Sequence, residues 1–150
     1  MRVRKMEPTD ELFQEMVLDH SRNPRRFGRL TAPGILHGDA CNPACGDEVE
    51  MWVQLAEDQH IEDISFTGQG CAISQAAASL LAVSVAGKSS VDSMALVKEY
   101  DAMLAGTDEG RNLGRLQILA AVRKFPARVA CARVAVGAFR KALEQYPAQG

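Results

Sequence analysis

Residues 49–56 constrain the fold more than any other segment because apolar residues occupy every second position. Val49, Met51, Val53 and Leu55 supply the apolar set, and glutamate and glutamine occupy two of the positions between them. A period of two is typical of a half-buried β-strand, whose successive side chains point to opposite faces. A strand needs partner strands, and its apolar face needs a cover. The segment therefore predicts a sheet with a second layer packed on one side.

The residues on either side of this segment predict its partner strands. Glu57-Asp58-Gln59 is typical of a turn, and residues 61–66 are expected to return as an antiparallel strand. The alternation breaks between Ile61 and Ile64, which indicates a β-bulge or a weakly specified start of that strand. Ile35-Leu36 is expected to begin a further short strand.

Helical patterns flank the predicted strands, mostly on the C-terminal side. Thr9-Asp10-Glu11 provides an N-cap candidate and first-turn acids for a helix that should end near Asn23-Pro24. It should end there because the residue before a proline avoids the α conformation. Gly87 is a C′ candidate for a helix that starts at Cys71. The expected helices cover residues 9–23, 71–86, a segment from Ser89 or Ser90 to about 105, about 113–122, and about 126–145.

A group of strands followed by a group of helices predicts an α+β fold. We expect a small antiparallel sheet of about three strands with helices packed on one face. The 150 residues fit one domain that spans residues 1–150, with residues 1–8 as a loose N-terminal arm.

Composition argues against several classes of function. The net charge of -2 lacks the basic excess of a nucleic-acid-binding domain, so we expect no nucleic-acid partner. No apolar run approaches the ~18 residues of a membrane-spanning helix, so we expect no membrane partner. Four cysteines without a recognisable secretory signal indicate a reducing compartment, where thiols act as ligands or nucleophiles. The expected location is the cytoplasm.

Three cysteines, far apart in the chain, have settings that favour a thiolate or a metal. Cys45 lies in a turn-forming stretch two residues before Asp47, and Cys71 begins a predicted helix after two glycines. Cys131 lies in the first turns of the last predicted helix, three residues after Arg128. Helix N-termini and nearby cations stabilise thiolates. Spacing alone leaves two alternatives open: inert buried thiols, or a tetrahedral site completed by Asp47.

The fourth cysteine and the histidines are weaker candidates. We interpret Cys41 as a bystander thiol, with a spare ligand or a resolving cysteine as the alternative. His37 is a minor ligand candidate because it precedes the Cys41–Asp47 segment closely. We expect His20 to pack on a helix surface and His60 to be exposed after a turn, so neither histidine needs a functional role.

Four motifs occur in an order that resembles one protein family. The chain is similar to the IscU/SufU family of NifU N-terminal-like iron–sulfur assembly proteins over roughly residues 10–146. Together the motifs are specific, although any one alone is not. They are Leu18–Arg25, Asn42–Asp47, Gly68–Ser74 and Lys124–Cys131.

The resemblance implies a choice between two branches of the family. The IscU branch, a scaffold for nascent clusters, has a histidine immediately before its third cysteine, and this chain has Ala130 there. The SufU branch lacks that histidine and carries an insertion between the second and third cysteines, which residues 107–122 resemble. The chain therefore looks SufU-like, which implies a zinc-dependent sulfurtransferase.

The resemblance also implies roles for the motif residues. Cys45, Asp47, Cys71 and Cys131 would bind zinc, and Cys45 would accept persulfide sulfur from a SufS-like cysteine desulfurase. Asp47 would orient the site, and Arg128 would support the thiolates or simply lie at the surface. A downstream SufBCD-like assembly scaffold would receive the sulfur. The main alternative is an IscU-type scaffold for a [2Fe–2S] cluster, and a third is a structural zinc domain.

Overall fold

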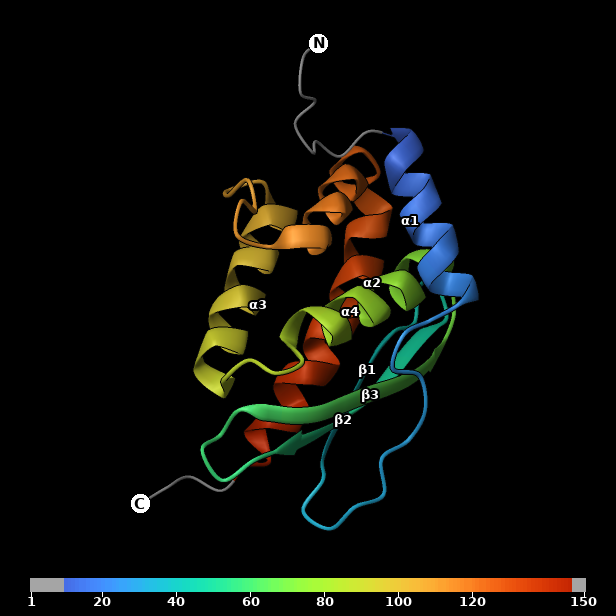
Figure 1. Ribbon diagram of the computed structural model, residues 1–150. Helices are drawn as coiled ribbons and strands as arrows, with labels where there is room; N and C mark the ends of the chain where they lie inside the picture. The colour runs from blue at the N-terminus through green and yellow to red at the C-terminus, as the bar shows by residue number, and fades with distance from the viewer. Residues whose placement is uncertain (1–9, 147–150) are drawn as a thin grey trace.

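The computed structural model describes residues 10–146, which form helices stacked on a three-stranded sheet (Figure 1). The expected arm, residues 1–8, and the expected N-cap residue Thr9 lie outside the described residues. In chain order the elements are α1 (Asp10–Arg22), β1 (Leu36–Asn42), β2 (Asp47–Leu55), β3 (Ile61–Gln69), α2 (Ala72–Val85), α3 (Ser90–Ala105), the 3₁₀ helix η1 (Gly114–Lys124) and α4 (Pro126–Glu144).

The sheet is an antiparallel meander in the order β1-β2-β3. The three apolar residues Val49, Met51 and Val53 are completely buried, as their period of two predicts. Gln54 pairs with Asp63 and Leu55 pairs with Ile61, so one residue of β3 is left over at this point. This register shift confirms the irregularity that the broken alternation predicts.

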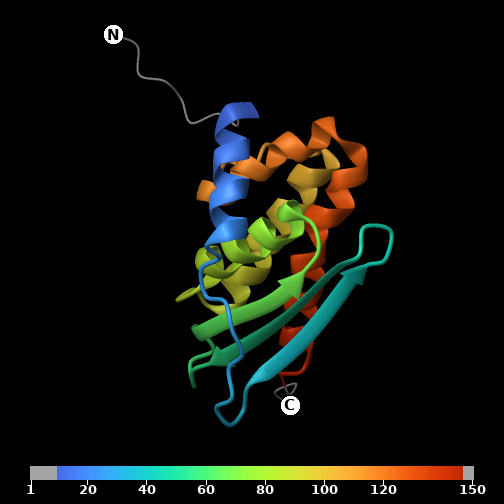
Figure 2. The same ribbon diagram turned by 90° about the vertical axis from the view of Figure 1, so that its right-hand side faces the viewer.

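Two helices cover one face of the sheet, and the other helices pack on top of them. α4 lies across β1 and β2, and α2 packs beside it on β3 (Figures 1 and 2). α4 approaches β1 so closely that a Cβ on Gly38 would clash with the backbone of Ala138 and Ala142. α1 packs on α2, and α3 packs against η1 and α4. The predicted α+β fold is confirmed.

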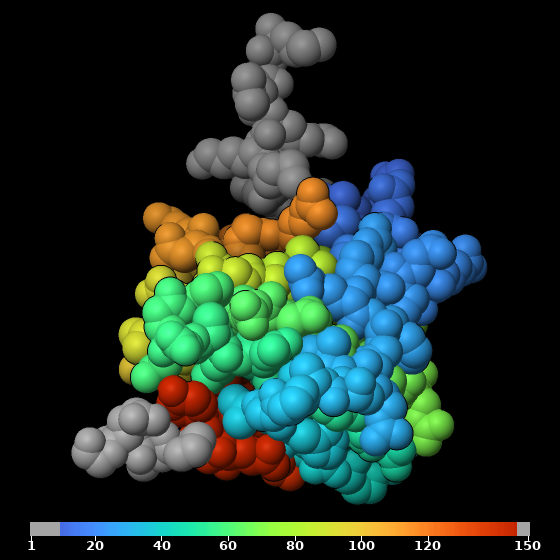
Figure 3. Space-filling model, turned by 60° about the horizontal axis from the view of Figure 1, so that its bottom comes forward, coloured from blue at the N-terminus to red at the C-terminus, as the bar shows by residue number. Residues whose placement is uncertain are grey.

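The opposite face of the sheet is partly covered by the chain segment that joins α1 to β1. Arg26 and Gly28 hydrogen bond to the backbone of Phe66 along the outer edge of β3. The Arg29 guanidinium carbon lies 5.4 Å from the centroid of the Trp52 ring. Figure 3 shows this segment in blue beside the strands. Trp52 is consequently buried although its side chain lies on the face away from α2 and α4.

The helix boundaries agree with the sequence patterns to within a few residues. Ser89 is the N-cap of α3, and its hydroxyl accepts a hydrogen bond from the Asp92 N–H at 3.0 Å. The helix expected at residues 113–122 is a 3₁₀ helix instead, and Gly114 begins it with a φ of 56°. Within residues 10–146, no helix is long and apolar enough to cross a membrane.

Candidate metal centre

Three elements meet at one end of the sheet and bring the separated cysteines together. The turn between β1 and β2 carries Cys45, the start of α2 carries Cys71, and the first turns of α4 carry Cys131. Figure 2 shows the β1–β2 turn beside the beginning of α4. A contact between residues 86 positions apart follows from this arrangement: the Cys131 thiol lies 3.4 Å from the Cys45 sulfur.

The β1–β2 turn holds Cys45 at its tip and returns Asp47 to the interior. The Cys45 N–H donates to the Asn42 carbonyl at 3.1 Å, which closes the turn. Gly46 has a φ of 67°, a left-handed conformation that glycine adopts at low cost. Cys45 is therefore only half-buried, whereas Asp47, two residues later, is completely buried.

Asp47 binds the start of α2. Its Oδ1 accepts a hydrogen bond from the Cys71 N–H at 2.7 Å, and its Oδ2 lies 3.7 Å from the Cys71 sulfur. Cys71 occupies the N-cap position of α2 but makes no capping hydrogen bond with its own side chain. The carboxylate therefore satisfies an N–H at the helix start and lies where the helix dipole favours negative charge.

Cys131 forms the buried wall of the site. Its side chain is completely buried on α4, and the Asn42 Nδ2 donates toward its sulfur at 3.7 Å. One ligand atom from each of Cys45, Asp47 and Cys131 lies within 4.8 Å of the other two. Ligands of a tetrahedral zinc ion are roughly 3.6–3.8 Å apart, given Zn–S bonds of about 2.3 Å and Zn–O bonds of about 2.1 Å. The side chains of Cys45, Asp47 and Cys131 are thus close to the spacing that a bound zinc ion would require, and the Cys71 sulfur lies beside the Asp47 carboxylate.

The environment changes the acidity of two of these groups in opposite directions. Burial, followed by contacts with Asp47, Cys45 and Cys71, raises the pKa of the Cys131 thiol. Burial also acts to raise the pKa of Asp47, but the Cys71 N–H and the thiols of Cys131 and Cys71 outweigh it and lower that pKa. The metal-free site therefore contains an ionised carboxylate beside a protonated thiol. Metal binding would release the proton of the thiol.

Because Gly70 has no side chain, the Asp47 carboxylate can lie against its backbone. It has a φ of 126°, and a Cβ at this position would overlap the Asp47 carboxylate. Only a residue without a Cβ permits this close approach.

Replacing Gly70 by alanine is therefore expected to displace Asp47 and to weaken zinc binding at least about tenfold, as the loss of one ligand-orienting contact does. Gly87→Ala is the matched control, since Gly87 has a φ of 82° but open space around its Cβ position. Both substitutions place a Cβ on a backbone with a positive φ, which costs roughly 1–3 kcal/mol. Equal zinc affinity of the two variants, measured by chelator competition, would contradict this role of Gly70.

Arg128 lies at the exposed rim of the site, one turn before Cys131. A hydrogen bond with Cys131, followed by the charges of Cys71, Cys131 and Cys45 in their thiolate forms, raises the pKa of Arg128. The guanidinium is thus within electrostatic reach of all three sulfurs.

The weaker candidates lie away from this centre. Cys41 is exposed on β1, one position out of phase with Asn42, which faces Cys131. His37 contacts Glu50 and Trp52 on the opposite face of the sheet, and His60 bonds to Asp58 at the β2–β3 turn.

His20 is buried rather than on the helix surface, and its Nδ1 lies 2.7 Å from the Ser79 hydroxyl. None of the three histidines of the chain reaches the thiols.

Asn42 and Gly70 are site residues to which sequence patterns assign no role. Both residues belong to the motifs that resemble the family, but the role of each depends on the residue that it contacts, which is distant in sequence. The alternation of side chains along β1 could have indicated the role of Asn42. Ala40 and Asn42 lie on the same face of the strand, and that face packs on α4.

A three-stranded meander covered by two helices, with three thiols and a carboxylate at one end, places the chain among α+β domains that carry a cluster of potential metal ligands. A family model described as the NifU-like N-terminal domain matches residues 12–132. The chain therefore belongs to the family of NifU-like N-terminal domains.

Relatives in this family have names that indicate two activities. The chain is 36% identical over 138 residues to the "iron-sulfur cluster assembly scaffold protein IscU" of Streptococcus pyogenes serotype M1, covering 91% of this chain and 85% of that protein. It is 35% identical over 134 residues to the "zinc-dependent sulfurtransferase SufU" of Bacillus subtilis, covering 88% and 89%.

The fold also matches a solved structure. A crystal structure from Fervidobacterium islandicum AW-1, described as a cluster assembly scaffold protein for the SUF system, superposes with a TM-score of 0.81 at 26% identity. The match covers 90% of this chain and 99% of that chain.

Proposed function

We propose that the protein acts in iron–sulfur cluster assembly as a zinc-dependent sulfurtransferase that carries persulfide sulfur. The observation that supports this most strongly is the asymmetry of the four candidate ligands. Asp47 and Cys131 are completely buried, whereas Cys45 lies half-buried at the tip of an exposed turn. A sulfur acceptor must reach a donor on another protein, and Cys45 is the thiol placed to do so.

The residues of the site suit zinc. Cys45, Asp47, Cys71 and Cys131 would hold the ion, which stabilises thiolates without electron transfer. Thiolates and a carboxylate oxygen are ligands that zinc accepts, and the spacing of Cys45, Asp47 and Cys131 is close to that of three ligands of a tetrahedral ion. Arg128 would add electrostatic support for the thiolates from the rim.

Sulfur transfer to Cys45 requires no external oxidant. The Cys45 thiolate attacks the terminal sulfur of a cysteine persulfide on a cysteine desulfurase. A new S–S bond forms at Cys45, the S–S bond to the donor cysteine breaks, and the donor leaves as a thiolate. The terminal sulfur keeps its oxidation state, so the electrons balance. A downstream cluster-assembly scaffold would take the sulfur by the same exchange, and a reducing compartment such as the cytoplasm suits the four free thiols.

The second candidate is a scaffold on which a [2Fe–2S] cluster forms on the same thiols. The name of the Streptococcus pyogenes relative favours it. Ala130, which stands where the scaffold branch has histidine, argues against it. The three histidines of the chain also have their contacts away from the thiols. The polar loop and η1 between Cys71 and Cys131, which resemble the SufU insertion, also favour the carrier.

Metal analysis of protein purified without oxygen tests the proposal. We expect one zinc ion per chain, and incubation with a desulfurase and cysteine should add one sulfur atom to Cys45, detected by mass spectrometry. A brown protein that contains iron and sulfide would support the scaffold instead.

Zinc removal separates the carrier from a purely structural zinc domain. The apolar core between the sheet, α2 and α4 does not depend on the site, so the thermal unfolding transition should persist after chelation. Sulfur acceptance should be lost. Loss of the transition together with retained transfer would assign the metal a structural role.

A further inference from the structure

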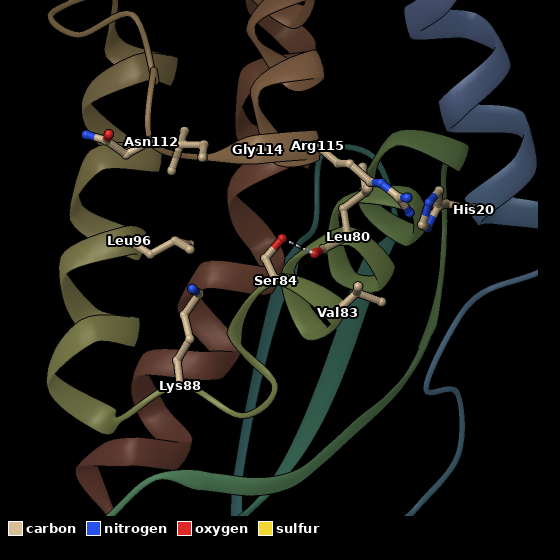
Figure 4. A pocket seen from close by; sticks show the side chains of 10 residues that line it. His20, Leu80, Val83, Ser84, Lys88, Leu96, Asn112, Gly114 and Arg115 are labelled. Atoms are coloured by element: carbon tan, nitrogen blue, oxygen red, sulfur yellow. Dashed lines mark hydrogen bonds between the residues drawn. The ribbon is translucent and has the colours of Figure 1, made fainter.

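A cavity of about 220 Å³ lies between α1, α2, α3 and the start of η1, away from the thiols (Figure 4). Leu80, which lines it, is nine residues beyond Cys71 on α2, about 14 Å along the helix axis at 1.5 Å per residue. The cavity is therefore distinct from the candidate metal centre. The residues that line it are His20, Leu80, Val83, Ser84, Lys88, Leu96, Asn112, Leu113, Gly114 and Arg115.

Two cationic residues that are exposed to solvent, Lys88 and Arg115, line the cavity, and no acid does. Among the described residues, neither Lys88 nor Arg115 forms an ion pair, although Arg111 in the same region pairs with Glu109. Glu99 lies near the edge, but its two carboxylate oxygens accept hydrogen bonds from the backbone and side chain of Asn112. The uncompensated charge of the cavity is therefore positive.

His20 adds a buried hydrogen-bond donor. The Ser79 hydroxyl oxygen accepts a hydrogen bond from the Arg25 N–H at 2.9 Å. Within residues 10–146, the acceptor for the hydrogen of this hydroxyl is the His20 Nδ1, at 2.7 Å. The Nδ1 therefore accepts, and the Nε2 carries the hydrogen of a neutral imidazole. Burial, followed by the charges of Arg25 and Arg115, lowers the pKa of His20, which favours the neutral imidazole.

The donors lie at one end of the cavity. Figure 4 shows the Arg115 guanidinium extending toward the His20 ring, with Lys88 and Leu96 on the other side. Among residues 10–146, none accepts a hydrogen bond from the His20 Nε2 or from the Arg115 guanidinium. A planar guanidinium next to an imidazole N–H matches the two oxygens of a carboxylate.

The remaining wall is aliphatic and limits the size of a ligand. Leu80, Val83, Leu96 and Leu113 line the cavity. The volume is below the roughly 300–1,000 Å³ of pockets for drug-sized ligands. We propose that this cavity binds a small organic anion, a carboxylate with a short aliphatic body, whose carboxylate contacts Arg115 and His20 and whose body packs on the leucines.

Titration of the zinc-loaded protein with butyrate, followed by two-dimensional NMR, tests this proposal. Saturable shifts of the His20 ring and Arg115 side-chain signals are expected. Butyramide has the same shape without the charge and should bind at least about tenfold more weakly, since a charge-assisted hydrogen bond contributes about 1.5–3 kcal/mol. Inorganic phosphate lacks the aliphatic body and should also bind more weakly.

Variants locate the site. Arg115→Gln should weaken butyrate binding at least about tenfold, and Lys88→Gln should weaken it less. Arg111→Gln, which removes an exposed arginine outside the cavity, should leave binding unchanged. Sulfur acceptance by Cys45 should be the same in all three. Equal binding of butyrate and butyramide, tighter binding of phosphate, or an unchanged affinity in Arg115→Gln would each overturn the proposal.

Discussion

Replacing Cys45 by serine is expected to reduce sulfur acceptance from a cysteine desulfurase roughly a thousandfold or more, as removal of a nucleophile commonly does. A serine hydroxyl is not ionised near neutral pH, and it forms no persulfide. The fold should be retained because Cys45 is half-buried in a turn that a backbone hydrogen bond to Asn42 closes. The measurement is the rate at which sulfur from cysteine appears on the protein, together with the acceleration of the desulfurase.

Two further cysteine variants make this prediction specific. Cys41→Ser is the matched control, since Cys41 is an exposed thiol on the adjacent strand and faces away from Cys131; its rate should be unchanged. Cys131→Ser should lower zinc content as well as the rate, because Cys131 is the buried wall of the site. Full desulfurase acceleration by Cys45→Ser would remove Cys45 from the role of acceptor.

The sheet could be predicted from the sequence because the patterns that define its strands lie within short segments of the chain. The apolar residues of 49–55 recur with period two, and the broken alternation after Ile61 even locates the register shift. Ser89 likewise lies where an N-cap is expected, because a serine before a polar first turn satisfies helix N–H groups through its own side chain.

Other features depend on residues that are distant in sequence, and local patterns do not reveal them. η1 has the apolar pattern of a short helix, and that pattern does not distinguish the 3₁₀ hydrogen bonding of the structure from that of an α-helix. Two residues of the site also depend on partners that are distant in sequence. Asn42 contacts Cys131, which lies 89 positions later, and Gly70 leaves room for the Asp47 carboxylate. His20 reads as a surface residue until Ser79 is placed beside it.

Replacing Asp47 is expected to have the second large effect, on both zinc affinity and stability. At neutral pH the carboxylate is ionised, and its lowered pKa means that the folded protein favours the charged form more than the unfolded chain does. This contribution to stability is present above the ordinary pKa of aspartate and is lost as the pH falls through the lowered value. Asp47→Ala removes the acceptor of the Cys71 N–H, and leaving a buried donor without a partner costs about 1–3 kcal/mol.

Asp47→Asn separates the two roles of the side chain. Its amide oxygen can still accept from the Cys71 N–H, so the metal-free variant should lose less stability than Asp47→Ala, as measured by urea unfolding. Both variants lack the anionic ligand and should bind zinc at least about a hundredfold more weakly in competition with a chelator. Asp39→Asn, on the exposed face of β1, is the control and should match the unmodified protein in both measurements. If Asp47→Asn bound zinc as tightly as the control, the carboxylate would serve only to position α2, and its negative charge would have no role in zinc binding.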